Sequence, residues 1–277
     1  MAAAPLRFGV MCSGTQLASW SMRAVEAVLA TGAELALVIS QKRPEVRKNP
    51  PWKRLVTLLK APNALWTAYE RLYIDRYVSG LRGVDAAGLF TGVPVIECEI
   101  VRKGKFSEYF RPEDIERIRA ARLDFLLRFA FGIIRGDILQ SARYGVWSFH
   151  HDDEQRYRGG PPAFWEMYCN DPHTGVVLQR LTERLDGGII LKKGSFPTIN
   201  DSYARNYDQS LFGAAGWAGS VCRDIAAGQA AYLEDTPSRS SAPVFRAPSN
   251  SQMVVFGARL LRNAMANRVW ARRRAPA

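Results

Sequence analysis

The order of apolar runs and helical spacings in the first part of the chain predicts a parallel α/β sheet. An apolar run with β character, Leu6–Met11, precedes a small polar loop. Apolar residues then recur at helical spacing, among them Leu17, Met22 and Val25. A second apolar run follows at Glu34–Ser40. Strand, loop, helix and strand in this order begin an α/β fold whose strands run parallel.

The middle of the chain continues this pattern. Leu123–Ala130 is almost continuously apolar, which is typical of a strand buried on both faces. Further strands are expected around Val95 and at Tyr144–His150, Gly175–Thr182 and Gly188–Phe196, and helices at Arg111–Arg122 and Pro161–Asn170. We therefore predict a Rossmann-like α/β domain over residues 1–200, with a mostly parallel sheet flanked by helices.

Two segments depart from this pattern. A basic helical insertion is expected at about residues 41–85, after the second strand. A helical C-terminal extension is expected over residues 201–277, where Asp201 or Ser202 can cap the first helix. A Pro/Ser-rich connection and a basic amphipathic helix from Met253 complete the extension.

Composition and charge narrow the class of protein. The 277 residues are 47% hydrophobic, and no apolar run is long enough for a signal peptide or a membrane span. The four cysteines lie far apart, so we expect reduced thiols, a cytoplasmic location, and neither a zinc site nor a disulfide framework.

The formal net charge of +12 is concentrated in two segments. Gln41–Arg82 carries ten Lys or Arg against three acids, and Arg259–Arg274 carries six Arg and no acid. Two interpretations stay open: a solvated basic surface, or attraction to a polyanion, an anionic substrate or an anionic membrane.

The polar stretch "SFHHDDEQRYRGGPPAFWEM" begins at Ser148, at the end of an expected strand. His150 lies where open α/β sheets place their sites, although a lone histidine can also be a core residue. Asp186 in "RLDGGII" marks another strand boundary, although a turn aspartate would also fit there. A metal cluster at His151–Asp153 is disfavoured, because consecutive residues of an extended segment point to opposite sides.

The loop Ser13–Thr15 follows the first expected strand. It holds the single glycine Gly14, so it is not a dinucleotide-binding fingerprint. A helix N-terminus directly after Ser13, Gly14 and Thr15 would be suited to bind an anionic part of a substrate.

Several motifs together resemble the folate-dependent formyltransferases, a superfamily that includes glycinamide ribonucleotide transformylase, methionyl-tRNA formyltransferase and the sugar N-formyltransferases. "SFH" stands where that family has Asn-x-His, and "YRGGPP" is similar to its Tyr-Arg-Gly turn. "HTGVVLQRLTERLDGGIIL" is similar to its Thr-Gly-Val-Thr…Leu-Asp-x-Gly segment, and "LLRFAFGIIRGDIL" to its folate pocket. The resemblance extends from about Leu123 to Leu191 and is looser over Leu6–Ser40.

The resemblance implies 10-formyltetrahydrofolate as formyl donor and a metal-free centre formed by His150 and Asp186, with Asp186 orienting the imidazole and raising its pKa. It further implies a set of residues that contact folate and one residue of the Tyr-Arg-Gly turn that contacts the substrate. The implied folate-binding residues are Phe129, Phe131, Gly132, Ile133, Ile134, Leu185 and Gly187; the substrate contact is Arg158. Ser148 replaces the family's asparagine, and its hydroxyl is expected to donate to the oxyanion.

The resemblance predicts an N-formyltransferase acting on a small amine, with a nucleotide- or lipid-linked amino sugar as the favoured acceptor. A tRNA acceptor is disfavoured, because the methionyl-tRNA formyltransferases carry a C-terminal β-barrel, whereas helices are expected here after Asp201. Nucleic acid in general is not expected as a partner. A purine-pathway acceptor, a formyltetrahydrofolate hydrolase, and a binding module that lost its chemistry are the alternatives. An oligomer is compatible with the sequence.

The C-terminal tail has two interpretations. From Met253 to Trp270, apolar residues recur at near-helical spacing and arginines interrupt them. One interpretation is a helix packed on the domain; the other is an interfacial helix that binds an anionic membrane surface.

Overall fold

The computed structural model describes residues 4–42, 61–104, 106–184 and 187–274, with side chains up to residue 267. The strands are β1 (Arg7–Cys12), β2 (Gln16–Ala18), β3 (Glu34–Gln41), β4 (Gly83–Asp85), β5 (Val95–Cys98), β6 (Ile100–Lys103), β7 (Ser107–Phe110), β8 (Phe125–Arg128), β9 (Ile133–Ile134), β10 (Val146–His150), β11 (His173–Arg180) and β12 (Ile189–Pro197). The α-helices are α1 (Ser19–Leu29), α3 (Ala64–Tyr69), α4 (Asp75–Tyr77), α5 (Pro112–Ala120), α6 (Phe164–Tyr168), α7 (Tyr203–Ala214), α8 (Trp217–Ala226) and α9 (Asn250–Arg274). The other helical turns are Glu70–Ile74, Ser79–Leu81, Gly136–Gln140 and Ala231–Glu234.

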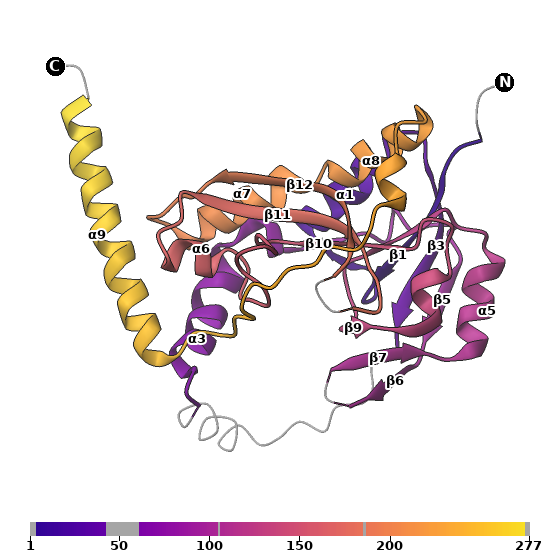
Figure 1. Cartoon of the computed structure of the whole chain (residues 1–277), viewed down its shortest axis with the longest axis horizontal. Coiled ribbons are helices and arrows are strands. Elements are labelled where there is room, and N and C mark those ends of the chain that lie inside the picture. Colours follow the sequence, from indigo (N-terminus) through magenta and orange to yellow (C-terminus); the bar gives the residue numbers. More distant parts are fainter. Residues whose placement is uncertain (1–3, 43–60, 105, 185–186, 275–277) are drawn as a thin grey trace.

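A seven-stranded sheet in the order β12-β11-β10-β8-β1-β3-β5 forms the centre of the fold (Figure 1). The pairs from β10 through β8, β1 and β3 to β5 are parallel, and β11 and β12 are antiparallel to their neighbours. The prediction of a Rossmann-like, mostly parallel sheet is confirmed.

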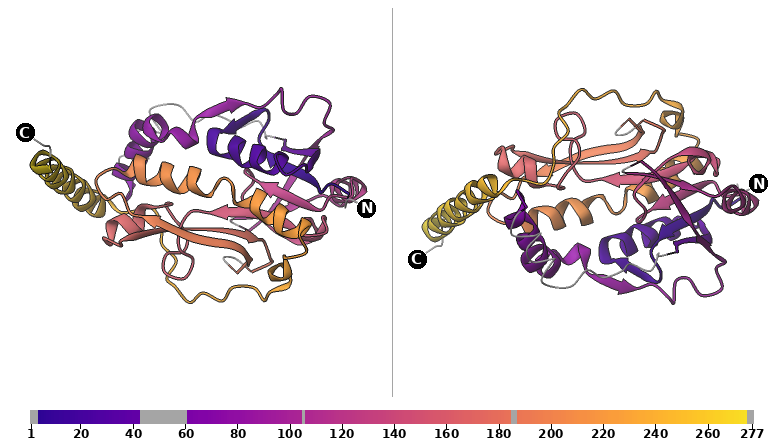
Figure 2. Two further views of the ribbon diagram at one scale, coloured as in Figure 1. Left: turned by 90° about the horizontal axis from the view of Figure 1, so that it is seen from above. Right: turned by 90° about the horizontal axis from the view of Figure 1, so that it is seen from below.

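The helices α1, α7 and α8 lie along one face of this sheet (Figure 2). The core cluster on that face combines strand residues such as Phe8 and Trp147 with Val221 of α8. The C-terminal extension therefore shares a core with the sheet, whereas the domain boundary at residue 200 stays a prediction. A second core cluster, which includes Ile115 of α5, lies between that helix and the sheet.

Two local features differ from the sequence prediction, and one agrees with it. The single helix expected after Ser202 is two helices, because the chain breaks at Gly216 between α7 and α8. The Ser202 hydroxyl does cap α7, accepting from the N–H of Arg205 at 3.3 Å. The small sheets β2-β4 and β6-β7-β9 were not expected, because their strands of two to four residues are too short to show a period.

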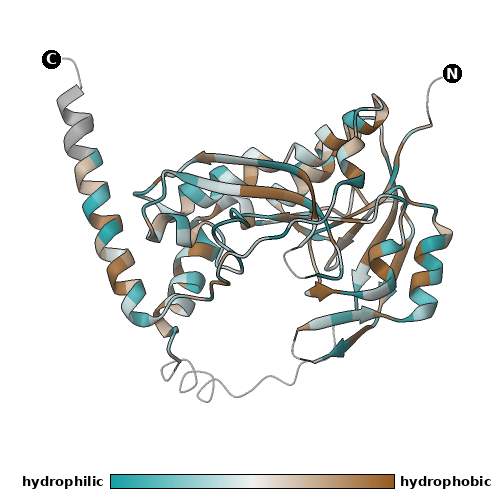
Figure 3. Ribbon diagram, in the orientation of Figure 1, coloured by the Kyte–Doolittle hydropathy of each residue, from teal (hydrophilic) through white to brown (hydrophobic). Residues whose placement is uncertain are grey.

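The helix α9 projects from one end of the molecule, and its base packs on an aromatic cluster (Figure 1). Met253 and Phe256 are buried in that cluster with Trp66, Phe164 and Tyr203. Apolar and polar residues alternate along the coloured part of α9 (Figure 3). The described part of the inserted segment, from residue 61, contributes α3 to the same cluster, while residues 43–60 lie outside the described residues.

Two helical glycines provide a matched test of how tightly α8 packs against α1. A methyl group at Gly219 in α8 would lie 2.4 Å from the backbone oxygen of Ala27, whereas one at Gly257 in α9 would meet nothing within 4 Å. We expect Gly219→Ala to lower the free energy of unfolding by about 1–3 kcal/mol through overpacking. Gly257→Ala should raise that free energy by roughly 0.5–1 kcal/mol, because alanine favours the helix.

Urea denaturation of both variants and the wild type measures these changes. A Gly219→Ala protein as stable as Gly257→Ala would show that α1 and α8 are not in the tight contact described.

Candidate active site

A cavity of about 340 Å³ opens at the end of the sheet where β8 and β10 finish. Its volume lies in the range of roughly 300–1,000 Å³ that is typical of small-molecule sites. Strands β8, β9, β10 and β11, the segment 181–184 and the C-terminal extension all contribute to its walls. Its lining residues include Arg128, Ile133, Ser148, His150, Gln179 and Val244.

Ser148 and His150 lie on the same face of β10, because residues two apart on a strand point the same way. Both line the cavity. The pairing of Ser148 with Gln179, and of His150 with Val177, holds β10 against β11 and fixes both side chains in position. Ser148 is 6% exposed, and its hydroxyl donates a long hydrogen bond to the Phe149 carbonyl, at 3.4 Å.

Asp152 contacts the catalytic candidate directly: its Oδ1 lies 2.6 Å from Nε2 of His150. The Asp152 side chain is 4% exposed and that of His150 is 21% exposed, so the contact between them reaches from the interior to the cavity. A buried carboxylate at this distance orients the imidazole and stabilises positive charge on it. The sequence prediction missed this role of Asp152, although the spacing of two residues in an extended segment is the signal that could have found it.

Asp186, the acid expected to orient His150, and Leu185 both lie outside the described residues. Gly187 is described, and its carbonyl accepts a hydrogen bond from the Thr182 hydroxyl at 2.7 Å. Thr182 lines the cavity, so the described ends of this loop approach the site. The roles of Asp186, Leu185 and Gly187 stay predictions.

Glu166 of α6 lies behind Asp152, with 1% of its surface exposed. Burial, reinforced by the charge of Asp152, raises the pKa of the Glu166 carboxyl to about 8, and the backbone N–H groups of Asp153 and Gly175 oppose this rise. Glu166 is therefore protonated at neutral pH. A neutral acid here avoids a second negative charge beside Asp152.

The neighbouring polar residues of the loop point to different partners. His151 is buried against Trp20, with ring centroids 4.9 Å apart, and burial followed by the charge of His150 lowers its pKa to about 3. Asp153 and Glu154 both bind Lys193, at 2.7 and 3.2 Å. In the part of the chain that the structure describes, no three His, Cys, Asp or Glu residues form a metal-binding group.

The loop reaches this position because Gly175 of β11 has no side chain. A methyl group there would lie 2.7 Å from the backbone nitrogen of Asp153. The loop backbone can therefore lie directly on β11.

The structure divides the residues expected to contact folate. Gly132, Ile133 and Ile134 line the cavity. Phe131 instead packs on Phe110, and Phe129 packs edge-on against Trp20 in the main core. The sequence alone cannot show which aromatic residues next to a predicted pocket line it and which pack in the core, because each side chain can turn to either side of the chain.

The expected anion site after the first strand is not formed as predicted. Strand β2 follows the turn of Ser13, Gly14 and Thr15, and α1 begins only at Ser19. The N–H of Ser19 donates to the Arg82 carbonyl at 2.9 Å, so the chain itself takes up one of the free N–H groups at this helix end. The pairing of β2 with β4, a contact distant in sequence, displaced the expected helix start.

The Pro/Ser-rich connection forms a strap across the site (Figure 1). Arg158 pairs with Val244 in an isolated bridge, and the N–H of Phe245 donates to the Arg158 carbonyl at 2.6 Å. Next to this bridge, Gly159 and Val244 line the cavity. Arg158 thus lies beside the cavity wall and anchors the C-terminal extension, whereas its predicted contact with substrate stays a prediction.

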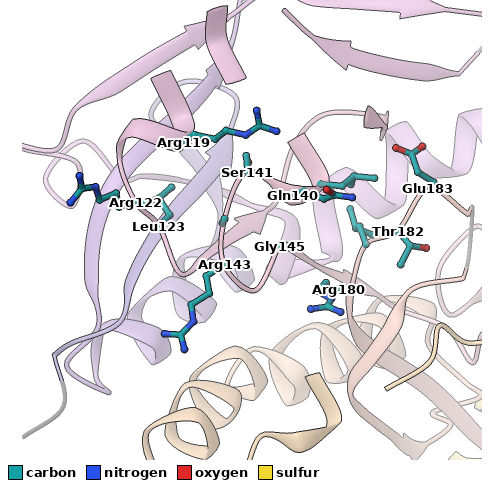
Figure 4. A pocket seen from close by; sticks show the side chains of 13 residues that line it. Arg119, Arg122, Leu123, Gln140, Ser141, Arg143, Gly145, Arg180, Thr182 and Glu183 are labelled. Carbon is teal, nitrogen blue, oxygen red and sulfur yellow. The ribbon is translucent and has the colours of Figure 1, made fainter. Parts of the chain in front are cut away.

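A second cavity, of about 650 Å³, lies beyond the segment 181–183. Its arginines Arg119, Arg122 and Arg143 point away from one another (Figure 4). Arg119 and Arg143 face Asp137 and Asp124, each at 3.8 Å. No set of side chains converges there, so the smaller cavity around His150 is the better candidate for chemistry.

Glu166 generates a pH prediction. Its pKa is raised on folding from 4.5 to about 8, so the folded protein binds this proton more tightly than the unfolded chain. Its contribution to stability is therefore complete below pH 4.5 and is lost as the pH rises through 8. Glu166→Gln should gain on the order of 2–4 kcal/mol relative to wild type between pH 5 and pH 9.

Denaturation at both pH values measures this difference. Glu154→Gln is the matched control: it removes a buried acid that binds Lys193, so it should be less stable than wild type. A difference between Glu166→Gln and wild type that does not change with pH would contradict the assignment.

Comparison with known proteins supports the sequence resemblance, although no family model matches the chain. Methionyl-tRNA formyltransferase from Lysinibacillus sphaericus is 28% identical over 128 residues, which cover 46% of this chain and 38% of that protein. The chain thus matches less than half the length of such curated relatives.

Solved structures share the fold. Glycinamide ribonucleotide transformylase 1 from Symbiobacterium toebii superposes with a TM-score of 0.51 and 14% identity, covering 81% of this chain and 89% of that one. An N-formyltransferase from Helicobacter canadensis, in complex with folinic acid and dTDP-3-aminofucose, superposes with a TM-score of 0.50 and 11% identity, covering 87% and 71%. The chain thus shares the fold of the formyltransferases and, over about half of its length, is similar in sequence to methionyl-tRNA formyltransferases.

Proposed function

We propose that this protein transfers a formyl group from 10-formyltetrahydrofolate to a small amine. The observation that carries the proposal is the His150–Asp152 pair at the wall of a cavity of ligand size, at the carboxyl end of a parallel strand. The apolar wall of Gly132, Ile133 and Ile134 is suited to a flat heteroaromatic ring.

The chemistry uses His150 as the proton carrier. The amine nitrogen attacks the formyl carbon, and the carbonyl electron pair moves to the formyl oxygen. His150, directly or through water, takes a proton from the amine and returns one to the nitrogen of the donor as its bond to carbon breaks. Asp152 holds the imidazole and stabilises its charged form.

An anionic amine, such as a nucleotide-linked amino sugar, is the acceptor we favour. Arg128, Arg135 and Arg184 line the cavity against the single acid Glu183 among its described lining residues, so it favours negative charge. The Helicobacter canadensis neighbour was solved with such a nucleotide sugar. Beyond β12, the described residues form helices and an isolated bridge at Val244 rather than a further sheet.

Turnover by site variants tests the reaction. His150→Ala should lower formyl transfer by roughly 100-fold or more, because it removes the proton carrier, and Asp152→Asn should lower it less. We expect the same direction for Asp186→Ala, and roughly ten- to a thousandfold loss for Ser148→Ala if its hydroxyl donates to the oxyanion. Binding of folinic acid should persist in all four variants.

The control is His173→Ala, which changes an exposed histidine outside the cavity. Near wild-type turnover by His150→Ala would exclude this site. Release of formate without an amine would identify a hydrolase, and folinic acid binding without any turnover would identify a binding module.

We further propose that the outward face of α9 binds an anionic membrane surface. Val254, Leu261 and Met265 are 65%, 62% and 53% exposed there, and the helix carries no acid. Met253 and Phe256 are buried at its base, so the helix is both packed and exposed. No helix in the described ranges is long and apolar enough to cross a membrane.

Sedimentation with anionic vesicles tests the membrane proposal. The double variant Leu261→Ser/Met265→Ser should bind anionic vesicles more weakly at low salt, with an unchanged Tm, because both side chains point to solvent. Val101→Ser, an exposed apolar residue on β6, is the control. Wild-type protein that ignores anionic vesicles at low salt would exclude the membrane role.

A further inference from the structure

Arg128 is a charged residue of the cavity that the mechanism above does not use. It ends β8, and its backbone lies opposite Ser148 in the parallel pairing of β8 with β10. Both residues line the cavity. The guanidinium of Arg128 is thus on the same wall as the Ser148 hydroxyl and the His150 imidazole.

Among the described residues, no acceptor satisfies the Nε of the Arg128 guanidinium. Its Nε is buried and has no hydrogen-bond partner, and no described acid lies within 4 Å of it. Burial lowers the pKa of Arg128, and the charge of Glu108 acts in the opposite direction.

Glu108 is occupied elsewhere. One of its oxygens accepts from Arg102 at 3.3 Å, and the other accepts from the backbone N–H of Gly132 at 2.6 Å. It therefore acts on Arg128 only at longer range.

A buried, charged donor without an acceptor costs free energy in the ligand-free protein. Such a group is retained at a cavity when a ligand atom supplies the missing partner. The atom that satisfies a guanidinium best is a negatively charged oxygen.

We propose that Arg128 binds a negatively charged oxygen of the ligand in this cavity. If the protein transfers formyl groups as proposed above, that oxygen is the formyl oxygen, and this assignment rests on the proposed function. It gains its charge when the carbonyl electron pair moves onto it during amine attack. It loses that charge when the carbonyl bond re-forms and the bond from carbon to the donor nitrogen breaks, with the proton delivered by way of His150.

The first experiment measures the Tm of the ligand-free protein. Arg128→Met removes an unsatisfied buried donor, so its Tm should equal or exceed that of wild type. Arg128→Gln, which keeps a neutral donor, guards against poor packing of methionine. Arg102→Met is the matched control, because it removes the exposed arginine that does bind Glu108.

The second experiment separates catalysis from binding. Arg128→Met should lower kcat by roughly 100- to 1,000-fold, while the Kd for folinic acid changes by no more than about threefold. Arg128→Lys, which keeps the charge, should restore part of kcat. Arg102→Met should keep wild-type kcat.

Three results would overturn the inference. A Tm several degrees lower in both Arg128→Met and Arg128→Gln would make Arg128 a structural partner of Glu108. An unchanged kcat would remove it from the reaction. A Kd for folinic acid that rises with kcat unchanged would place the contact on the bound donor rather than on the developing charge.

Failure of the proposed function is recognised separately. Wild-type protein that neither binds folinic acid nor transfers formyl would exclude formyl transfer before any variant is made. The Tm comparison still decides the role of Arg128 in that case: a retained Tm supports an anion-binding guanidinium for another ligand, and a lowered Tm overturns it.

Discussion

The cost of burying charge around one cavity is the constraint on which this site depends. Asp152 is 3% exposed and remains beside His150, while Glu166, 1% exposed, carries a proton at neutral pH. Two ionised carboxylates near each other in the interior would repel each other, and the protonation of Glu166 removes that repulsion. The orientation of His150 follows from that arrangement.

Backbone contacts supply the geometry that this arrangement requires. The loop after β10 lies on β11 because Gly175 leaves room for Asp153, and Lys193 of β12 binds both Asp153 and Glu154. The strap pairs with Arg158 across Gly159, where a methyl group would lie 2.3 Å from the Phe245 carbonyl oxygen. The C-terminal extension is therefore part of the wall of the site as well as part of the core.

Sequence similarity to the relatives covers less of this chain than similarity of fold does. The sequence match covers 46% of the chain, and the fold match reaches 81–87% at low identity. What is common is the sheet that carries His150.

The sequence alone determined the parallel sheet, because runs such as Leu123–Ala130 and the helical spacing after Gly14 are local patterns of burial. It also indicated His150, because a polar loop after an apolar strand is visible in one dimension. It could not show that Phe129 and Phe131 pack away from the cavity while Ile133 lines it.

Only the tertiary structure decided the surroundings of His150. The partnership of Asp152 with Glu166, the closure of α1 by Arg82 and the unsatisfied Nε of Arg128 depend on contacts between segments far apart in sequence. Whether a charged side chain is paired or unpaired, exposed or buried, is a property of its neighbours in space. Sequence spacing carries no record of those neighbours, so the chemistry of these residues appears only in the folded protein.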